Sequence, residues 1–220
     1  MIVAGVDEAG RGPVVGDMFV ALVAMERDSV SMLTKFGVRD SKELSRERRE
    51  ELLKHILKLV RVVVVARATP REIDSTNLNT LFSEKVARCI AIARRKLGTG
   101  FVVYVDACGD PSRISMAVKR RLEAMGILDV EIHAMHGADK SIPVVSAASI
   151  VAKVLRDRHI DELKKIYGDF GSGYPSDPKT RRWLEQVVSK GEIPPIVRKK
   201  WSSVKRLSTK TLLDYLGRNE

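Results

Sequence analysis

Two apolar segments that lie far apart in the chain each run directly into carboxylates. Residues 1–6 are followed at once by Asp7 and Glu8, and residues 101–105 are followed by Asp106. Both segments are short and rich in β-branched residues, which is typical of buried strands. A helical pattern long enough for a crossover connection lies between them, so the two strands are expected to be parallel. Parallel neighbours would bring Asp7 and Asp106 to the same end of one sheet.

The remaining patterns predict an α/β fold with a mixed five-stranded sheet flanked by helices. Apolar or β-branched runs predict further strands, while apolar stripes, capping residues and proline in the first turn predict helices. The further strands are expected over residues 18–25, 62–66 and 130–134. The helices are expected over residues 45–59, from 69 over a short stretch, and over 79–97, 112–125, 143–167 and 178–189, with a loop at 136–140.

A chain of 220 residues can form one sizeable core, and residues 168–179 are its best candidate boundary because they are dense in Gly, Pro, Ser and Asp. We expect a core over residues 1–170 and a small helical C-terminal lobe over residues 171–220. The two cysteines form neither a disulfide framework nor a metal-binding spacing. No segment has the pattern of a membrane span or a signal peptide. The protein is therefore expected to be cytoplasmic and monomeric, without membrane contact.

The chain is strongly basic, with a formal net charge of +11. The excess is concentrated toward the C-terminus, where residues 151–220 carry 16 Lys and Arg against 9 Asp and Glu. A basic surface favours a polyanionic partner. The stretch that follows Glu8 contains Gly10, Arg11 and Gly12, in which glycine permits close backbone approach and arginine offers a fork for phosphate.

A fourth acid, Asp139, lies in the loop between the strand at 130–134 and the helix at 143–167. Four carboxylates in one pocket would repel one another strongly unless cations were bound. Ligation by oxygen alone favours Mg²⁺ or Mn²⁺, and two such ions can stabilise both oxygens of a phosphoryl displacement. The simpler interpretation is that Asp7 and Glu8 are turn acids before an ordinary hairpin loop.

Five segments together closely resemble the ribonuclease HII family, and its archaeal members in particular. In chain order they are DEAGRGPVVG at 7–16, DSKELS at 40–45, VDACGD at 105–110, ADKSIPVVSAASIVAKVLRD at 138–157 and GSGYPSDPKT at 171–180. They occur in family order and with family-like spacing, from Met1 to about Trp183. The resemblance implies a ribonuclease H-like catalytic core over residues 1–170 and a substrate-binding lobe over residues 171–220.

The resemblance also implies an activity. The chain would be an endoribonuclease that hydrolyses the RNA strand of RNA/DNA hybrids and the phosphodiester at single ribonucleotides in duplex DNA. It would use two Mg²⁺ or Mn²⁺ ions, leave 5′-phosphate and 3′-hydroxyl ends, and serve ribonucleotide excision repair and DNA replication.

Residue roles follow from the same resemblance. The metal-binding and catalytic acids of the family correspond to Asp7, Glu8, Asp106 and Asp139. The loop that contacts the ribose 2′-hydroxyl and its phosphate corresponds to Gly10, Arg11 and Gly12. The tyrosine at the junction between ribonucleotide and deoxyribonucleotide corresponds to Tyr174, and the phosphate contacts by position correspond to Lys42 and Lys140.

The residues by themselves allow other interpretations of these positions and of the function. Tyr174 could be a surface anchor, and Lys42 and Lys140 could be ordinary solvated charges. A binder of hybrids without catalytic activity would gain nothing from four like charges facing a polyanion. A metal-dependent DNA nuclease with the same fold is opposed by the loop at residues 10–12 and by Tyr174.

The C-terminal region suggests two further contacts. Phosphate contacts are expected from a basic run with one tryptophan, made up of Arg198, Lys199, Lys200, Trp201, Lys205 and Arg206. Residues 209–216 resemble the short peptide by which replication and repair enzymes dock on a sliding clamp. Leu212 and Tyr215 match that pattern and would share one face of a helical turn, whereas Thr209 replaces a glutamine and Leu216 an aromatic residue. The alternative is that this helix packs on its own core.

Overall fold

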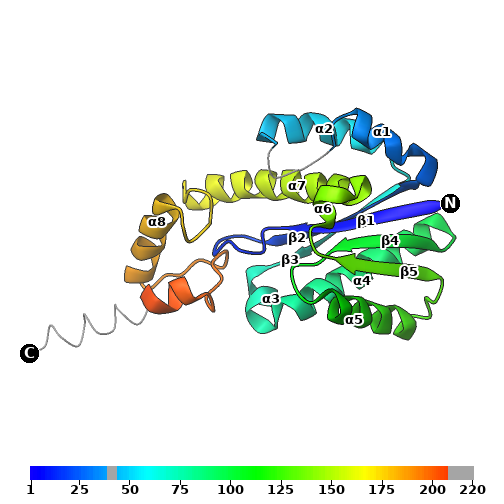
Figure 1. The fold of residues 1–220 in the computed structure, drawn as a ribbon. Helices are drawn as coiled ribbons and strands as arrows, with labels where there is room; N and C mark the ends of the chain where they lie inside the picture. The colour runs from blue at the N-terminus through cyan, green and yellow to red at the C-terminus, as the bar shows by residue number, and fades with distance from the viewer. Residues whose placement is uncertain (39–43, 208–220) are drawn as a thin grey trace, which may run out of the picture.

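The computed structural model describes residues 1–38 and 44–207, and within them five strands form one sheet with helices on both faces (Figure 1). The strands are β1 (Ile2–Ala9), β2 (Met18–Glu26), β3 (Val62–Ala68), β4 (Phe101–Asp106) and β5 (Val130–Met135). The α-helices are α1 (Val30–Lys35), α2 (Arg46–Leu59), α3 (Pro70–Ser75), α4 (Leu78–Leu97), α5 (Pro111–Ala124), α6 (Ala138–Ser141), α7 (Pro143–Tyr167) and α8 (Pro178–Ser189). The predicted fold class is confirmed.

The strand order is β3-β2-β1-β4-β5. β1 runs antiparallel to β2 and parallel to β4, and β5 runs parallel to β4. Val6 pairs with Val105, so Asp7 and Asp106 are the next residues on neighbouring strands. The predicted parallel pairing, and with it the meeting of the two acids at one sheet end, is confirmed.

β1 is longer than the sequence pattern predicts. It continues to Ala9 because β2 pairs with it as far as the position where Ala9 lies opposite Phe19. Asp7 and Glu8 therefore lie inside the strand and not beyond its tip. Since successive side chains of a strand point to opposite faces of the sheet, the two acids face different helical layers.

Apolar clusters cover both faces of the sheet. One cluster joins the sheet to α4 and α5, and the other joins it to α1, α2 and α7. The approach of α7 to β1 requires Gly5, because a Cβ built on Gly5 would lie 2.3 Å from the carbonyl carbon of Val144. This close contact determines the distance between α7 and β1, the strand that carries Asp7 and Glu8.

Local signals account for most helix boundaries. The Ser45 side chain accepts a hydrogen bond from the Arg48 backbone N–H at 3.2 Å and caps α2. Asn77 caps α4, so this helix begins slightly earlier than predicted, and Gly98 ends it with φ 72°. α7 and α8 have the predicted bounds. The segment predicted as a loop at residues 136–140 overlaps the short helix α6, which begins at Ala138 and ends at Ser141.

A third apolar cluster connects the C-terminal region to the loop after β1. Its buried members are Val14, Val15, Ile160, Leu163, Phe170, Leu184, Ile196, Val197 and Val204. In Figure 1, α8 and the segment that follows it lie beyond the end of α7, next to this loop. The described part of the predicted C-terminal lobe, residues 171–207, thus packs against the loop after β1 and the end of α7. Across residues 1–38 and 44–207, we find no helix with the length and apolarity needed to span a membrane.

Candidate active site

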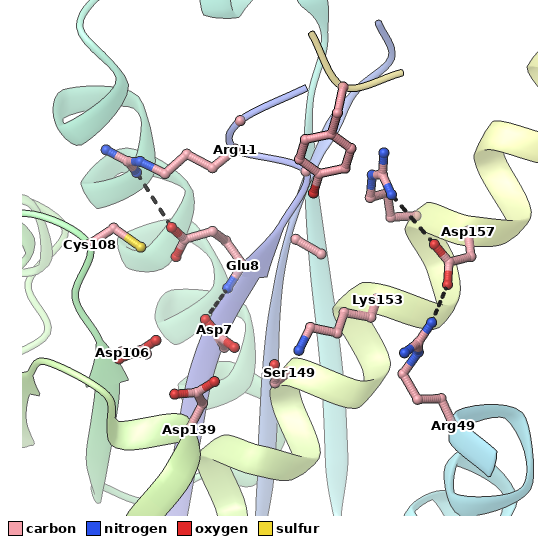
Figure 2. Close-up of a pocket in the computed structure, with 15 residues that line it drawn as sticks. Asp7, Glu8, Arg11, Arg49, Asp106, Cys108, Asp139, Ser149, Lys153 and Asp157 are labelled. Carbon is pink, nitrogen blue, oxygen red and sulfur yellow. Dashed lines mark hydrogen bonds and ion pairs between the residues drawn. The ribbon is translucent and has the colours of Figure 1, made fainter. Parts of the chain in front are cut away.

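A pocket of about 380 Å³, called here the acidic pocket, lies where β1 and β4 end (Figure 2). Predicted residues that line it are Asp7, Glu8, Gly10, Arg11, Gly12, Asp106, Asp139 and Tyr174. They come from β1, the loop after it, β4, α6 and the loop before α8. Folding therefore brings together segments that are widely separated in the sequence.

Three buried carboxylates form the centre of the acidic pocket. Asp7, Asp106 and Asp139 each offer one oxygen, and these oxygens lie within 4.8 Å of one another. Asp106 Oδ1 accepts a hydrogen bond from the Ala138 N–H at 3.0 Å, which ties the end of β4 to the start of the helix that carries Asp139. Asp7 accepts one from the Glu8 N–H at 2.7 Å and another from the Ser149 hydroxyl of α7.

The electrostatics of these acids fit a cation. Burial raises the pKa of Asp7 well above its usual range, and the neighbouring charges of Glu8 and Asp106 raise it further. Burial also raises the pKa of Glu8, against opposing contributions from Cys108 and Arg11. A divalent cation bound among the carboxylates would offset both burial and repulsion, and a set of oxygen donors suits a hard ion.

Glu8 lies beside the three-carboxylate cluster and is not part of it. Its Oε1 is 3.5 Å from Arg11 Nη1, and the Cys108 thiol lines the acidic pocket on the side to which Glu8 points. Burial and the nearby charge of Glu8 raise the pKa of Cys108 to about 12. Figure 2 shows Glu8 pointing toward Arg11 and Cys108.

Tyr174 lies against the loop at residues 10–12. A Cβ built on Gly12 would be in van der Waals contact with the Tyr174 ring, at 3.6 Å from Cε1. The Arg156 guanidinium of α7 lies over the same ring, 5.0 Å from its centroid, and donates to the Ser172 carbonyl at 2.9 Å. α7 therefore helps to fix the position of Tyr174.

Several polar residues of α7 also line the acidic pocket, and the sequence patterns predict no role for them. They are Ser149, Lys153, Arg156 and Asp157, joined by Arg49 of α2, whose Nη2 lies 2.9 Å from Asp157 Oδ2. The intervals of four, three and one residues place the α7 set on one helical face. The sequence signal that could have identified these pocket residues is the occurrence of polar residues at this spacing in the mostly apolar segment 143–157.

Other predicted positions lie elsewhere. Lys140 is exposed and lines a separate hollow of about 330 Å³ with Thr34 and Ser146, so it is not brought into the acidic pocket. Lys42 and the segment 209–216 fall outside the described residues. His136, which the sequence leaves unassigned, has its Nδ1 at 2.7 Å from the Ala107 carbonyl oxygen.

The prediction that Arg198 contacts phosphate is wrong. Its side chain is fully buried and donates hydrogen bonds to backbone carbonyls of Gly10, Arg11 and Gly16. Its neighbours Lys199, Lys200, Lys205 and Arg206 are exposed. A run of charges in the sequence does not reveal which member turns inward, because that depends on the segment packed beneath it.

Comparison with known proteins places the chain in a family. The family model for Ribonuclease HII matches residues 4–204. Ribonuclease HII of Pyrococcus abyssi is 42% identical over 214 residues, which are 96% of this chain and 92% of that relative.

Solved structures agree. The crystal structure of the ribonuclease H2 from Pyrococcus horikoshii OT3 has a TM-score of 0.84 and 38% identity, covering 96% of this chain and 99% of that one. A chain in the structure of the PCNA:RNase HII complex from Archaeoglobus fulgidus has a TM-score of 0.80 and 40% identity, covering 92% and 96% respectively. With its buried acids inside the matched region, the chain belongs to the ribonuclease HII family and is a metal-dependent ribonuclease that cleaves the RNA strand of RNA/DNA hybrids.

Proposed function

We propose that this ribonuclease also cuts at single ribonucleotides embedded in duplex DNA, by two-metal-ion catalysis that leaves 5′-phosphate and 3′-hydroxyl ends. The observation that carries the proposal is the position of three buried carboxylates beside both the loop at residues 10–12 and Tyr174. Carboxylates alone would suit many phosphodiesters. A backbone loop at the ribose adds selectivity, because the 2′-hydroxyl is the group that distinguishes RNA from DNA.

Asp7, Asp106 and Asp139 would hold the divalent cations, with Glu8 at the edge of the same site. All of these donors are carboxylate oxygens, which favour Mg²⁺ or Mn²⁺ over softer metals. Such ions, when bound, supply a water nucleophile at neutral pH and stabilise the charge on the attacking and leaving oxygens.

The cationic side chains of the acidic pocket would hold the substrate backbone. Arg11, Lys153 and Arg156 surround the acids, and a guanidinium can contact two phosphate oxygens at once. In the reaction a water oxygen bonds to phosphorus, the bond from phosphorus to O3′ breaks, and O3′ takes up a proton. The upstream fragment then ends in a 3′-hydroxyl and the downstream fragment begins with a 5′-phosphate.

The loop at residues 10–12 would read the 2′-hydroxyl through its backbone, while Tyr174 contacts the junction with the following deoxyribonucleotide. The loop is closely packed at Gly10. This residue has φ 85°, and a Cβ there would lie 2.6 Å from the Asp17 carbonyl oxygen, so a larger residue would displace the backbone. Glycine at this position therefore keeps the loop backbone where it lines the acidic pocket.

We further propose that the protein acts as a monomer and that residues 209–216 dock on a sliding clamp. The support is the spacing of Leu212 and Tyr215, together with the similar RNase HII from Archaeoglobus fulgidus, whose structure was solved as a complex with PCNA. Docking on a clamp would place the enzyme on newly replicated duplex, where embedded ribonucleotides need removal.

Four end-labelled duplexes of one length test the cleavage proposal. They are all-DNA, DNA with one ribonucleotide, an RNA/DNA hybrid and all-RNA, each incubated with Mg²⁺, with Mn²⁺ or with a chelator. We expect cleavage of the second and third duplexes with either metal and none with the chelator. The upstream product should be extended by a DNA polymerase, since extension requires a 3′-hydroxyl.

The matched control is the Asp106→Asn variant under the same conditions, which should cut none of the four. Cleavage of the hybrid alone would contradict the single-ribonucleotide activity. Cleavage of the all-DNA duplex would instead support a DNA nuclease, and an upstream product that resists extension would contradict the proposed ends.

A further inference from the structure

A buried arginine lies beneath the loop at residues 10–16, and the functions described above do not use it. Arg198 Nε donates to the Gly16 carbonyl at 3.0 Å, Nη1 donates to the Arg11 carbonyl at 2.8 Å, and Nη2 donates to the Gly10 carbonyl. Burial of a guanidinium is costly unless its donors are satisfied. Here carbonyl oxygens of one loop give each of the three nitrogens one acceptor, which offsets much of this cost.

The segment around Arg198 is bonded to this loop along its length. The Arg198 N–H donates to the Val14 carbonyl at 2.9 Å, and the Gly16 N–H donates to the Ile196 carbonyl at 2.8 Å. Trp201 Nε1 donates to the Gly12 carbonyl at 3.3 Å, and its ring lies 5.1 Å from the Arg198 guanidinium. Arg198 and Trp201 therefore donate hydrogen bonds to carbonyl groups of the loop, and the Ile196 carbonyl accepts one from it.

The bonds made by Arg198 have a geometric consequence for the other side of the loop. In a planar trans peptide the C=O and N–H groups point in opposite directions, and the described residues contain no cis peptide. The carbonyls of Gly10 and Arg11 point to Arg198, so the N–H groups of Arg11 and Gly12 point away from it. The loop lines the acidic pocket, and buried Arg198 does not.

We propose that Arg198 is a positioning residue for ribonucleotide recognition. It fixes two successive peptide groups, so that the N–H groups of Arg11 and Gly12 are presented to the ribose 2′-hydroxyl. Orienting these donors before the substrate arrives avoids an ordering cost on binding. The inference rests on the proposed function, because it assumes that the loop reads the 2′-hydroxyl.

The same contacts extend to Tyr174. The Val14 N–H donates to the Gly173 carbonyl at 2.8 Å, while the Val14 carbonyl accepts from the Arg198 N–H. The backbone at residue 14 thus joins the loop that carries Tyr174 to the segment that carries Arg198. A substitution of Arg198 is therefore expected to weaken recognition of the sugar more than it weakens contacts to distant phosphates.

The test compares the binding of two duplexes that differ by one 2′-hydroxyl, measured in the Asp106→Asn background so that neither is cut. The readout is the ratio of the dissociation constant for all-DNA duplex to that for duplex with one ribonucleotide. We expect Arg198→Met to lower this ratio about tenfold, as for the loss of a well-formed hydrogen bond, with less than a twofold change in affinity for all-DNA duplex.

Two further variants separate the fork geometry from charge. Arg198→Lys keeps the charge, but one ammonium group cannot span the carbonyls of Gly10, Arg11 and Gly16, so the ratio should stay low. Arg182→Met removes a charge from the exposed face of α8 and should leave the ratio unchanged. Full recovery of the ratio in Arg198→Lys would contradict the role of the fork.

Arg198→Met could fail to fold, which thermal unfolding would reveal. In that case Trp201→Phe decides, because it keeps an aromatic ring but removes the hydrogen bond to the Gly12 carbonyl, and it should lower the ratio by about twofold to threefold. An unchanged ratio in folded Arg198→Met, or in folded Trp201→Phe, would overturn the inference, as would equal weakening of both duplexes. A parent with no preference for the ribonucleotide would overturn the proposed recognition itself.

Discussion

Alternation along β1 gives two adjacent acids different surroundings. Asp7 faces α7 and joins Asp106 and Asp139, whereas Glu8 faces Arg11 and Cys108. We therefore expect cation binding to depend most directly on the three-carboxylate cluster of Asp7, Asp106 and Asp139. This asymmetry follows from the period of two in a strand and from the extension of β1 to Ala9.

Replacing Asp7 or Asp106 with Asn should reduce cleavage of a ribonucleotide-containing duplex about a thousandfold, because a metal contributes several kcal/mol to transition-state stabilisation. In the presence of a chelator, either variant should melt about 2–4 °C above the parent, since removing one buried charge relieves repulsion. Initial cleavage rates and thermal unfolding measure the two effects. The control is Glu185→Gln, on the exposed face of α8; near-normal turnover in either Asn variant would refute the metal assignment.

Tyr174 should contribute to selectivity more than to affinity. We expect Tyr174→Ala to lower the ratio of kcat/KM for a single-ribonucleotide duplex to that for a uniform hybrid by about tenfold, because the ring positions the junction. Duplex affinity should change less than the ratio. Tyr174→Phe keeps the ring beneath Arg156 and should retain most of the selectivity. Parallel losses of affinity and rate in Tyr174→Ala would mark the residue as a simple binding contact.

Asp177 makes the loop that carries Tyr174 sensitive to acid. Its carboxylate accepts hydrogen bonds from the backbone N–H groups of Ser172 and Lys179 and from the Thr180 hydroxyl, and these hold its pKa well below the usual range. Because the pKa in the folded state lies below the unfolded value of about 3.9, this stabilisation is complete above that value and is lost as the pH falls toward the folded pKa.

We therefore expect Asp177→Ala to lower the melting temperature at pH 7, and the difference from the parent to shrink between about pH 4 and pH 2. Thermal unfolding at a series of pH values measures this. Asp28→Ala, at an exposed position after β2, is the matched control. A difference that stays constant across this range would show that the carboxylate charge does not stabilise the loop.

At the scale of elements, α7 links the sheet to the acidic pocket. Its first half packs on β1 through Gly5, and its polar face carries Ser149, Lys153 and Arg156 into the acidic pocket. The orientation of α7 about its own axis thus determines both its apolar contacts with β1 and the position of its cationic side chains in the acidic pocket. Substitutions that enlarge Gly5 are expected to disturb both.

The exposed basic residues after α8 are expected to contact phosphates as a group, through their combined charge. Neutralising Lys199, Lys200 and Lys205 to Gln should flatten the slope of log affinity against log salt by roughly 0.9 for each phosphate that no longer has a cationic partner. Affinities at several salt concentrations give the slope. The matched control neutralises Lys58, Arg95 and Lys96, at the ends of α2 and α4 away from the acidic pocket. An equal slope in both triple variants would leave the run as solvated surface.

At the scale of the whole molecule, we propose two separable tasks for the C-terminal region. Residues 196–201 support the loop at residues 10–16, and the proposed clamp segment lies at 209–216. A chain that ends at Ser208 should keep hybrid cleavage and thermal stability but lose binding to the sliding clamp of its own organism. Calorimetric titration of both chains with that clamp is the measurement, and a Leu212→Ala and Tyr215→Ala double variant is the control for chain length. Equal binding by both chains, or loss of folding on truncation, would contradict clamp docking.

Local patterns in the sequence were enough for the five strands, for the described α-helices other than α1 and α6, and for the arrival of Asp7 and Asp106 at one sheet end. Each of these depends on near neighbours: β-branched runs, caps such as Ser45, and prolines at the first turns of α7 and α8. The roles of the loop at residues 10–12 and of Tyr174 came from family motifs.

Only the tertiary structure decided which charged side chains are buried and which pocket each one faces. Arg198 looked like its neighbours Lys199 and Lys200, yet it lies under the carbonyls of Gly10 and Arg11, far away in the sequence. Lys140 follows Asp139 directly but lies outside the acidic pocket, because α6 turns it to the surface. The burial of a side chain is determined by the segment packed against it, and that contact is not encoded in the spacing of its sequence neighbours.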